Sequence, residues 1–301
     1  MSSSQWISGS TGSFSESVDR VARAIERADA VLVGAGAGLS TAAGFHYSGP
    51  RFEKDFADFR DRFGITDMYA GGFYPFPDDE TRWAWWSRMI WVNRYACPVG
   101  RPYQDLVRVL RGREHFVLTT NVDHQFQRAG VDRSRLFYTQ GDYGLLQCPE
   151  PCHQATYDNE DLVRLMVRDQ RDMRVPSELV PRCPRCGRVM VPNLRCDDTF
   201  VEDEGWHVAL GRYQDFVAAH ESGSVVLLEL GVGANTPVII KYPFWRMASQ
   251  NPKATYVQVN MGETIAPSAI ADQTVLVDGD AAEFLRELRG RLSGGENTDA
   301  A

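Results

Sequence analysis

Four of the six cysteines in the chain form two close pairs that can bind a metal ion. Three residues separate Cys148 from Cys152, and two separate Cys183 from Cys186. Two such pairs can present four thiolates to one zinc ion in tetrahedral geometry, so we predict a closed structural zinc site that needs no other ligand. The remaining thiols, Cys97 and Cys196, are expected in the core. A disulfide framework is disfavoured, because the chain is long and begins without a secretory signal.

A glycine-rich segment, VLVGAGAGLST, places Gly34, Gly36 and Gly38 directly after an apolar run. Glycine lets the backbone approach a pyrophosphate closely, and the helix that follows offers free N–H groups to an anion. The common dinucleotide fingerprint counted from Gly34 requires a glycine where the chain has Leu39. A dehydrogenase is therefore disfavoured. A tight strand-to-helix turn without a ligand is the alternative interpretation.

Polar side chains follow another apolar run, HFVLTT (115–120). Asn121 and Asp123 come just after this expected strand, where ligand sites of parallel sheets are usually built. The alternative is that they cap the next helix. Further along, Gln140 precedes Gly141 in the segment YTQGDYG. An amide has no useful basicity and can only donate and accept hydrogen bonds.

Short apolar, β-branched runs alternate with helix-length segments and predict the elements that position these residues. We expect strands at 30–33, 115–120, 224–230, 254–259 and 274–277, and helices at 15–28 and 281–292. Near-continuous hydrophobicity is typical of parallel strands that are covered on both faces. The predicted fold class is α/β, a Rossmann-like parallel sheet with an inserted zinc ribbon and a helical small domain.

The expected division of the chain follows from two breaks in this pattern. Residues 45–103 are rich in aromatics, proline and glycine, and 148–196 hold most of the cysteines, so both are interpreted as insertions. The Rossmann-like domain then comprises 15–44, 104–147 and 197–292, while 1–14 and 293–301 are expected to be disordered tails.

An aromatic segment lies inside the first insertion. RWAWWSRMIWVNRY (82–95) places Trp83, Trp86 and Ile90 on one helical stripe, with Trp85 and Met89 beside it. We expect a helix packed on the core, and the alternative is that part of it shapes a ligand pocket.

The composition excludes several classes of function. The chain has 301 residues, 43% of them apolar, and a net charge of −8, which argues against disorder and against a broad nucleic-acid surface. The basic cluster of Arg108, Arg111 and Arg113 is interpreted as a solvated helix end. No apolar run approaches the roughly 20 residues that span a bilayer, and the serine-rich N-terminal stretch is not predicted to be a secretory signal. We therefore expect a soluble, cytoplasmic protein that binds neither nucleic acid nor membranes.

Taken together, these motifs resemble those of the sirtuin family, the NAD-dependent deacylases and ADP-ribosyltransferases. GAGLSTAAGF (36–45), TTNVD (119–123), the cysteine ribbon, LGVGAN (230–235) and VQVN (257–260) occur in the family's order and cover roughly 18–290. The resemblance implies that NAD is consumed as a co-substrate and that zinc is structural. The cofactor-binding residues that it implies are Gly34, Ala35, Gly36, Ala37, Gly38, Ser40, Asn121, Asp123, Gln140, Gly231, Gly233, Asn235, Asn260, Gly279 and Asp280.

Four departures from the usual sirtuin pattern narrow this resemblance. Residues 46–49 read His-Tyr-Ser-Gly where Pro-Asp-Phe-Arg is usual, 119–121 read Thr-Thr-Asn in place of Thr-Gln-Asn, and 231–233 read Gly-Val-Gly in place of Gly-Thr-Ser. The catalytic His-Gly of deacylases is replaced by Gln140-Gly141. His46 and Tyr47 are candidates to face NAD, without a catalytic role.

The glutamine and the segment NLRCDDTFVED (193–203) resemble the macrodomain-linked branch, often called class M sirtuins. This resemblance implies protein ADP-ribosylation, a lipoylated carrier related to the glycine-cleavage H protein as acceptor, and a macrodomain hydrolase encoded nearby. It also implies that Asn121 orients the nicotinamide ribose or a water, and that Asp123 helps to hold the nicotinamide ring.

Gln140 also bears on which reaction is expected. Deacylation needs a base to activate a ribose hydroxyl, and histidine serves because its pKa is near neutrality. A carboxylate acceptor is already ionised and needs no base. We therefore predict mono-ADP-ribosyl transfer to Asp or Glu, with Asn121, Asp123, Gln140 and Arg195 as catalytic residues. The alternative for Arg195 is a surface salt bridge to Asp197 or Asp198, and the alternative functions are a weak deacylase and a non-catalytic NAD sensor.

Overall fold

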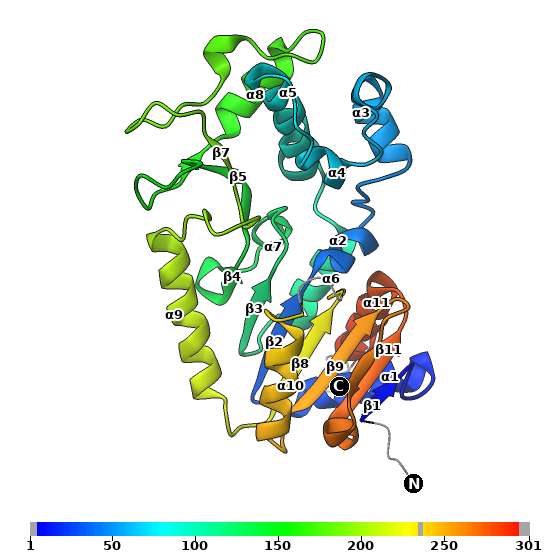
Figure 1. The fold of residues 1–301 in the computed structure, drawn as a ribbon. Helices are drawn as coiled ribbons and strands as arrows, with labels where there is room; N and C mark the ends of the chain where they lie inside the picture. Colours follow the sequence, from blue (N-terminus) through cyan, green and yellow to red (C-terminus); the bar gives the residue numbers. More distant parts are fainter. Residues whose placement is uncertain (1–4, 234–236, 295–301) are drawn as a thin grey trace.

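The computed structural model describes residues 5–233 and 237–294, which form a large lobe and a small lobe (Figure 1). The helices are α1 (Phe14–Arg27), α2 (Ala37–Ala42), α3 (Pro50–Phe63), α4 (Met68–Gly72), α5 (Asp79–Ile90), α6 (Arg101–Leu110), α7 (Gln125–Arg128), α8 (Glu160–Asp169), α9 (Glu204–Ala219), α10 (Lys241–Gln250) and α11 (Ala281–Gly294). The strands are β1 (Trp6–Ser8), β2 (Ala30–Ala35), β3 (His115–Thr119), β4 (Leu136–Tyr138), β5 (Gly141–Gln147), β6 (Tyr157–Asp158), β7 (Val191–Leu194), β8 (Val225–Leu230), β9 (Thr255–Asn260), β10 (Ile265–Pro267) and β11 (Thr274–Asp278).

The large lobe is built on a parallel sheet of six strands in the order β11-β9-β8-β2-β3-β4. The five strands predicted from the sequence are confirmed, and the short β4 adds the edge. The chain runs from β2 to β3 and β4 on one side, and later returns to β8 on the other side of β2 (Figure 1). The carboxyl ends of β2 and β8 therefore flank a topological switch point, where ligands of open α/β sheets bind.

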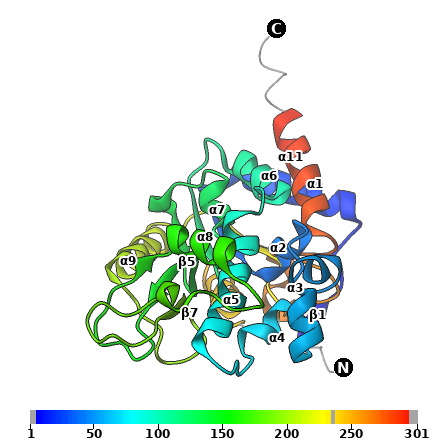
Figure 2. The same cartoon turned by 90° about the horizontal axis from the view of Figure 1, so that it is seen from above.

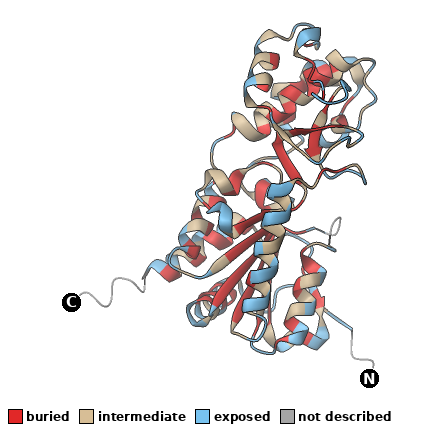
Figure 3. Ribbon diagram, turned by 90° about the vertical axis from the view of Figure 1, so that its left-hand side faces the viewer, coloured by how far each residue is buried: buried red, intermediate tan, exposed pale blue. Residues whose placement is uncertain are grey.

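Helices cover both faces of this sheet, so its strands are buried (Figure 3). On one face, α1, α6 and α11 pack against side chains such as Val33 and Val117. On the other face, α9 and α10 pack against neighbours in sequence such as Leu32 and Leu118. The alternation follows from the two-residue period of a strand. The predicted helices at 15–28 and 281–292 are confirmed as α1 and α11.

The small lobe combines both insertions. A three-stranded antiparallel sheet, β6-β5-β7, carries the cysteine segments, with α5 and α8 nearer to it and α3 farther away, beyond α5 (Figures 1 and 2). Side chains from 45–103 and 148–196 share one apolar cluster, in which Trp83 and Trp85 are fully buried. The sequence-based division placed β5 with the Rossmann-like domain, whereas it pairs with the strands of the zinc-ribbon region.

The expected tails differ from the structure at the N-terminal end. Trp6–Ser8 form strand β1, which pairs antiparallel with β10. A strand of three residues is too short to show a hydrophobic period in the sequence. The tail expected from residue 293 lies almost wholly outside the described residues. Within 5–233 and 237–294, no helix combines the length and the apolar character needed to cross a bilayer.

Candidate active site

A cleft of about 420 Å³ lies between the two lobes, beside the carboxyl end of β2. The large lobe contributes α2 and the loop 120–123, and the small lobe contributes α4, α5 and the ends of β5 and β7. The cleft brings together Ala37, Ser40, Asn121, Asp123, Gln140 and Arg195, which the sequence had singled out in separate segments.

Two glycine loops meet at the floor of the switch point. The Gly38 amide donates to the Gly231 carbonyl at 2.9 Å, and a Cβ on Gly36 or Gly38 would lie 2.7 Å from an atom of Gly231. Gly231 itself has a φ of +61°, a left-handed conformation that favours glycine. The close approach explains these glycines sterically, and it leaves the short helix α2 to begin at the edge of the cleft.

Asn121 lies at the end of β3 with its side chain already oriented. Its Nδ2 donates to the Gly36 carbonyl at 3.0 Å and to the Tyr103 hydroxyl at 3.1 Å. Tyr103 is fully buried, and burial raises its pKa well above the ordinary value, so it stays a neutral hydroxyl. Nothing in the sequence pointed to Tyr103, because it belongs to α6, far along the chain from the motif that it supports.

Asp123 is a buried carboxylate at the inner end of the cleft. Its Oδ2 accepts from Ser40 Oγ at 2.5 Å, and its Oδ1 accepts from the Gln125 amide at 3.1 Å. Burial raises the pKa of Asp123, although these two hydrogen bonds act in the opposite direction. The second bond reaches the first residue of α7, although Asp123 is not the N-cap of that helix, and Asp123 also lines the cleft.

Gln140 lines the cleft and directly precedes strand β5 of the small-lobe sheet. Its backbone carbonyl accepts from the backbone amide of Arg195 at 3.1 Å, which joins the start of β5 to the end of β7. Gly141 has a φ of +91°, and a Cβ there would lie 1.9 Å from the Asn193 carbonyl oxygen. The glycine is therefore a steric requirement for the backbone that presents Gln140.

Arg195 lines the cleft, and its acidic partner is neither of the two carboxylates that the alternative interpretation named. Its guanidinium binds Glu202 at 2.5 Å and lies over the Phe200 ring at 4.3 Å, and no pairing with Asp197 or Asp198 occurs among the described contacts. The neighbouring thiol is also a correction, because Cys196 is exposed and lines the cleft, whereas a core position was expected. The core position of Cys97 is confirmed.

Aromatic and sulfur side chains form the small-lobe wall of the cleft. Trp86 and Met89 of α5 face it, as do Tyr69 and Phe73 at α4. Both interpretations of the aromatic segment thus hold in part, since most of α5 is core and Trp86 is cleft. Tyr47 also lines the cleft, and burial raises its pKa to about 12.

The four paired cysteines converge in the small lobe. Their sulfur atoms all lie within 4.8 Å of one another, and Cys148–Cys186 and Cys152–Cys183 are each 3.6 Å apart. Tetrahedral zinc–sulfur bonds of about 2.3 Å place sulfurs roughly 3.8 Å apart, so the cluster fits a zinc ion. Cys148 directly follows β5, so the site braces the strand that begins beside Gln140.

The other predicted cofactor residues lie around the sheet rather than in the cleft lining. Gly34 and Ala35 are buried in β2, and Gly233 is exposed after β8. Asn260 and Gly279 lie at the carboxyl ends of β9 and β11, joined by a backbone hydrogen bond of 3.2 Å, and Asp280 accepts from the Glu283 amide at the start of α11. Asn235 lies outside the described residues.

Solved structures of other proteins show which fold the chain shares. No protein-family model matches the chain. A Sir2 homologue in complex with NAD has a TM-score of 0.59 and 17% identity, covering 92% of this chain and 94% of that one. A mutant Sir2 homologue in complex with ADP-ribose gives a TM-score of 0.59 at 16% identity over 94% and 99%. The fold is therefore that of the sirtuins.

Sequence similarity then identifies the family. The chain is 38% identical over 263 residues to a protein ADP-ribosyltransferase of Staphylococcus aureus (strain Mu50), covering 87% of this chain and 84% of that protein. It is 33% identical over 276 residues to a probable bifunctional ADP-ribose hydrolase/ADP-ribosyltransferase of Fusarium oxysporum f. sp. cubense, covering 85% of this chain and 45% of that protein. The chain belongs to the sirtuin-type protein ADP-ribosyltransferases.

Proposed function

We propose that the chain transfers a single ADP-ribose from NAD to a carboxylate of an acceptor protein. The observation that carries this proposal is that Gln140 lines the same cleft as Asn121 and Asp123. Among the described residues that line the cleft there is no histidine. A site without a neutral-pH base suits an acceptor that is already ionised.

The proposed site would bind NAD along the switch point. The phosphates would bind at the start of α2, where Ala37 is exposed and Gly38 is half-buried, because the first N–H groups of a helix favour an anion. Asn121 would orient the nicotinamide ribose, and its amide is pre-organised by Gly36 and Tyr103. Asp123 would help to hold the nicotinamide ring.

The transfer balances without a proton-accepting residue. The bond between ribose C1′ and the nicotinamide nitrogen breaks, and the electron pair leaves with nicotinamide, which neutralises its ring. A carboxylate oxygen then forms the bond to C1′, and its negative charge offsets the positive charge of the donor. No proton is released, so Gln140 is needed only to position the ribose hydroxyls through hydrogen bonds.

The acceptor side of the proposal rests on Arg195. Its guanidinium lines the cleft, and its partner Glu202 can be replaced by an acceptor carboxylate. We propose a lipoylated carrier related to the glycine-cleavage H protein as acceptor, within the class M branch. A macrodomain hydrolase would reverse the modification, and the name of the Fusarium relative, which joins the two activities, supports such a pairing. A reducing cytoplasm would keep the cysteine ligands available for zinc.

The test is intact-mass analysis of unlipoylated and lipoylated carrier proteins incubated with enzyme and NAD. The proposal expects one ADP-ribose adduct that neutral hydroxylamine removes, as an ester requires, and its loss with Gln140→Ala. Gln140→His need not restore deacylation, because the 193–203 segment also differs from that of deacylases. Efficient deacylation of lysine peptides without any adduct would refute the proposal in favour of a deacylase. Tight NAD binding without nicotinamide release would refute it in favour of a sensor.

Arg195→Ala tests the acceptor role separately. We expect this change to lower transfer to the carrier more than it lowers NAD binding, because the guanidinium would pair with the acceptor. Glu202→Gln is the matched control, since it removes the present partner of Arg195 and leaves the guanidinium free. An equal loss of NAD binding and transfer in Arg195→Ala would argue against the role.

A further inference from the structure

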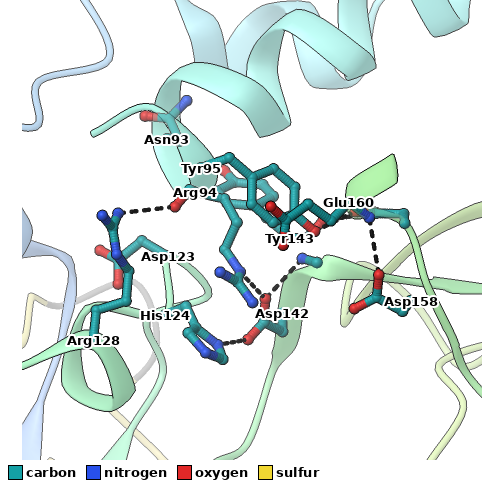
Figure 4. Close-up of polar contacts among 12 residues, drawn as sticks. Asn93, Arg94, Tyr95, Asp123, His124, Arg128, Asp142, Tyr143, Asp158 and Glu160 are labelled. Atoms are coloured by element: carbon teal, nitrogen blue, oxygen red, sulfur yellow. Dashed lines mark hydrogen bonds and ion pairs between the residues drawn. The ribbon is translucent and has the colours of Figure 1, made fainter. Parts of the chain in front are cut away.

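A buried ionic cluster is formed by residues next in sequence to those that line the cleft (Figure 4). Its centre is Asp142, whose side chain is almost fully buried. Oδ1 accepts from Arg94 Nε at 2.8 Å and from the Gly144 amide at 2.7 Å, while Oδ2 is hydrogen-bonded to Nδ1 of His124. Both carboxylate oxygens of Asp142 are therefore bonded, and two of the three partners, Arg94 and His124, come from segments distant in the chain.

The cluster connects the segments that carry the proposed reacting groups. His124 directly follows Asp123, and Asp142 lies two residues after Gln140. Arg94 belongs to the π-helical segment Trp91–Tyr95 that ends the aromatic helix α5, and its carbonyl accepts from Arg128 at 3.1 Å. One carboxylate therefore joins the loop after β3, the start of β5 and the helical insertion.

We propose that Asp142 is a positioning residue, which holds the strand that presents Gln140 against the loop that presents Asn121 and Asp123. Neither Asp142 nor His124 is among the described residues that line the cleft, so the role is exerted through Gln140 and Asp123. This inference rests on the proposed transfer from NAD, because it assigns a task to the same site.

The charges in the cluster keep this link intact at neutral pH. Burial by itself raises the pKa of Asp142, but the hydrogen bond and charge of His124, together with Arg94 and the Gly144 amide, hold its pKa below the ordinary value. The carboxyl group is thus ionised when the enzyme works. Charge-assisted hydrogen bonds of this kind are about twice as strong as neutral ones.

The backbone of His124 shows why the link matters for geometry. Its φ is +62°, a left-handed conformation that few residues with a side chain adopt. The bond to Asp142 holds the residue in place although the conformation is unfavourable by itself. If the bond is lost, the loop can relax and shift Asp123 and Asn121 relative to Gln140. A misplacement of about 1 Å can lower the rate of a positioned reaction by about 100-fold.

Two substitutions of His124 separate the bond from the backbone conformation. Asparagine tolerates the left-handed region, and its Nδ2 occupies the place of Nδ1 of the imidazole, so His124→Asn can still donate to Asp142. Glycine adopts the same conformation without strain but provides no donor. His124→Gly should therefore lower kcat for nicotinamide release by about 30-fold or more, with KM for NAD changed by less than about threefold, while His124→Asn stays near wild type.

Asp142→Asn tests the centre of the cluster, and Asp105→Asn is its matched control. Asp105 is also a buried carboxylate bound by an arginine, with Arg289 Nη1 at 2.8 Å, but it joins α6 to α11 away from the cleft. Both substitutions remove one buried charge from an ion pair. We expect Asp142→Asn to lower kcat with little change in KM, and Asp105→Asn to lower the melting temperature with kcat near wild type.

The measurement is release of nicotinamide from NAD as a function of NAD concentration, with melting temperature recorded for each variant. If kcat of His124→Gly equals that of His124→Asn, or if kcat of Asp142→Asn equals that of Asp105→Asn, the positioning role is refuted. The His124 pair decides the question even if Asp142→Asn does not fold. A wild-type chain that releases no nicotinamide overturns the proposed function together with this inference, whereas an active wild type with unaffected His124→Gly overturns this inference alone.

Discussion

Adding a single methyl group at Gly141 should lower the activity strongly while the chain still folds. A Cβ built there lies 1.9 Å from the Asn193 carbonyl oxygen, whereas carbon and oxygen normally approach to roughly 3.3 Å. In Gly141→Ala the two backbones must therefore part by about 1.4 Å. Gln140 and Arg195 move with them, because they are joined across these strands by a hydrogen bond of 3.1 Å.

The expected loss follows from that displacement. A shift of about 1 Å in a positioned group lowers rates by about 100-fold, so we expect at least that loss in nicotinamide release and in transfer. The left-handed backbone, with a φ of +91°, adds a cost of roughly 1–2 kcal/mol in stability. In a chain of this size each kcal/mol lowers the melting temperature by about 2–4 °C.

Gly130→Ala is the matched control for backbone strain. Gly130 has a φ of +97°, but nothing lies within 4 Å of an added Cβ. We expect a similar strain cost in stability and turnover near wild type. Nicotinamide release under NAD saturation, together with thermal melting, measures both effects. If Gly141→Ala retained activity within about threefold of Gly130→Ala, the steric reasoning about Gln140 would be wrong.

Three further predictions concern charge and metal. Burial raises the folded-state pKa of Asp123, so ionising its carboxyl group lowers stability as pH rises through that pKa. Asp123→Asn should therefore melt at a higher temperature than wild type at pH 8 and lose this advantage below about pH 4. The same variant should release nicotinamide more slowly. Elemental analysis should find about one zinc per chain. Chelation of the metal or Cys183→Ser should lower the melting temperature and slow transfer. Full activity without metal would contradict the inference that the zinc site holds the strand beside Gln140 in place. Glu229→Gln should lower the free energy of unfolding in denaturant by about 3–5 kcal/mol, because it leaves the buried charge of Lys241 without its partner. Adding Lys241→Met should restore much of that loss. Equal stability of the single and double variants would exclude the pairing argument.

Much of the large lobe was predictable because its signals are local. Apolar β-branched runs with helix-length spacers specify parallel strands buried on both faces, and all five expected runs became strands. β4 was missed, since three residues carry little periodicity. β5 was not predicted as a strand, and its residues were placed in the Rossmann-like domain, because the local sequence does not record that they pair with β6 and β7.

The sequence by itself determined the chemistry that is available. The spacing of the four cysteines is enough to predict a shared metal, because ligands close in the chain must lie close in space. The segment that carries Asn121 and Asp123 marks the end of a strand, and Gln140 marks the absence of a base, both readable without coordinates.

Only the tertiary structure decided how these groups are held. Tyr103 orients Asn121 from a separate helix, and Asp142 joins His124 to Arg94 across the two lobes. It also showed that Arg195 pairs with Glu202 and that Cys196 faces the cleft. Such contacts depend on how one lobe packs on the other, and no periodicity or spacing along the chain records the relative placement of elements that meet only after folding.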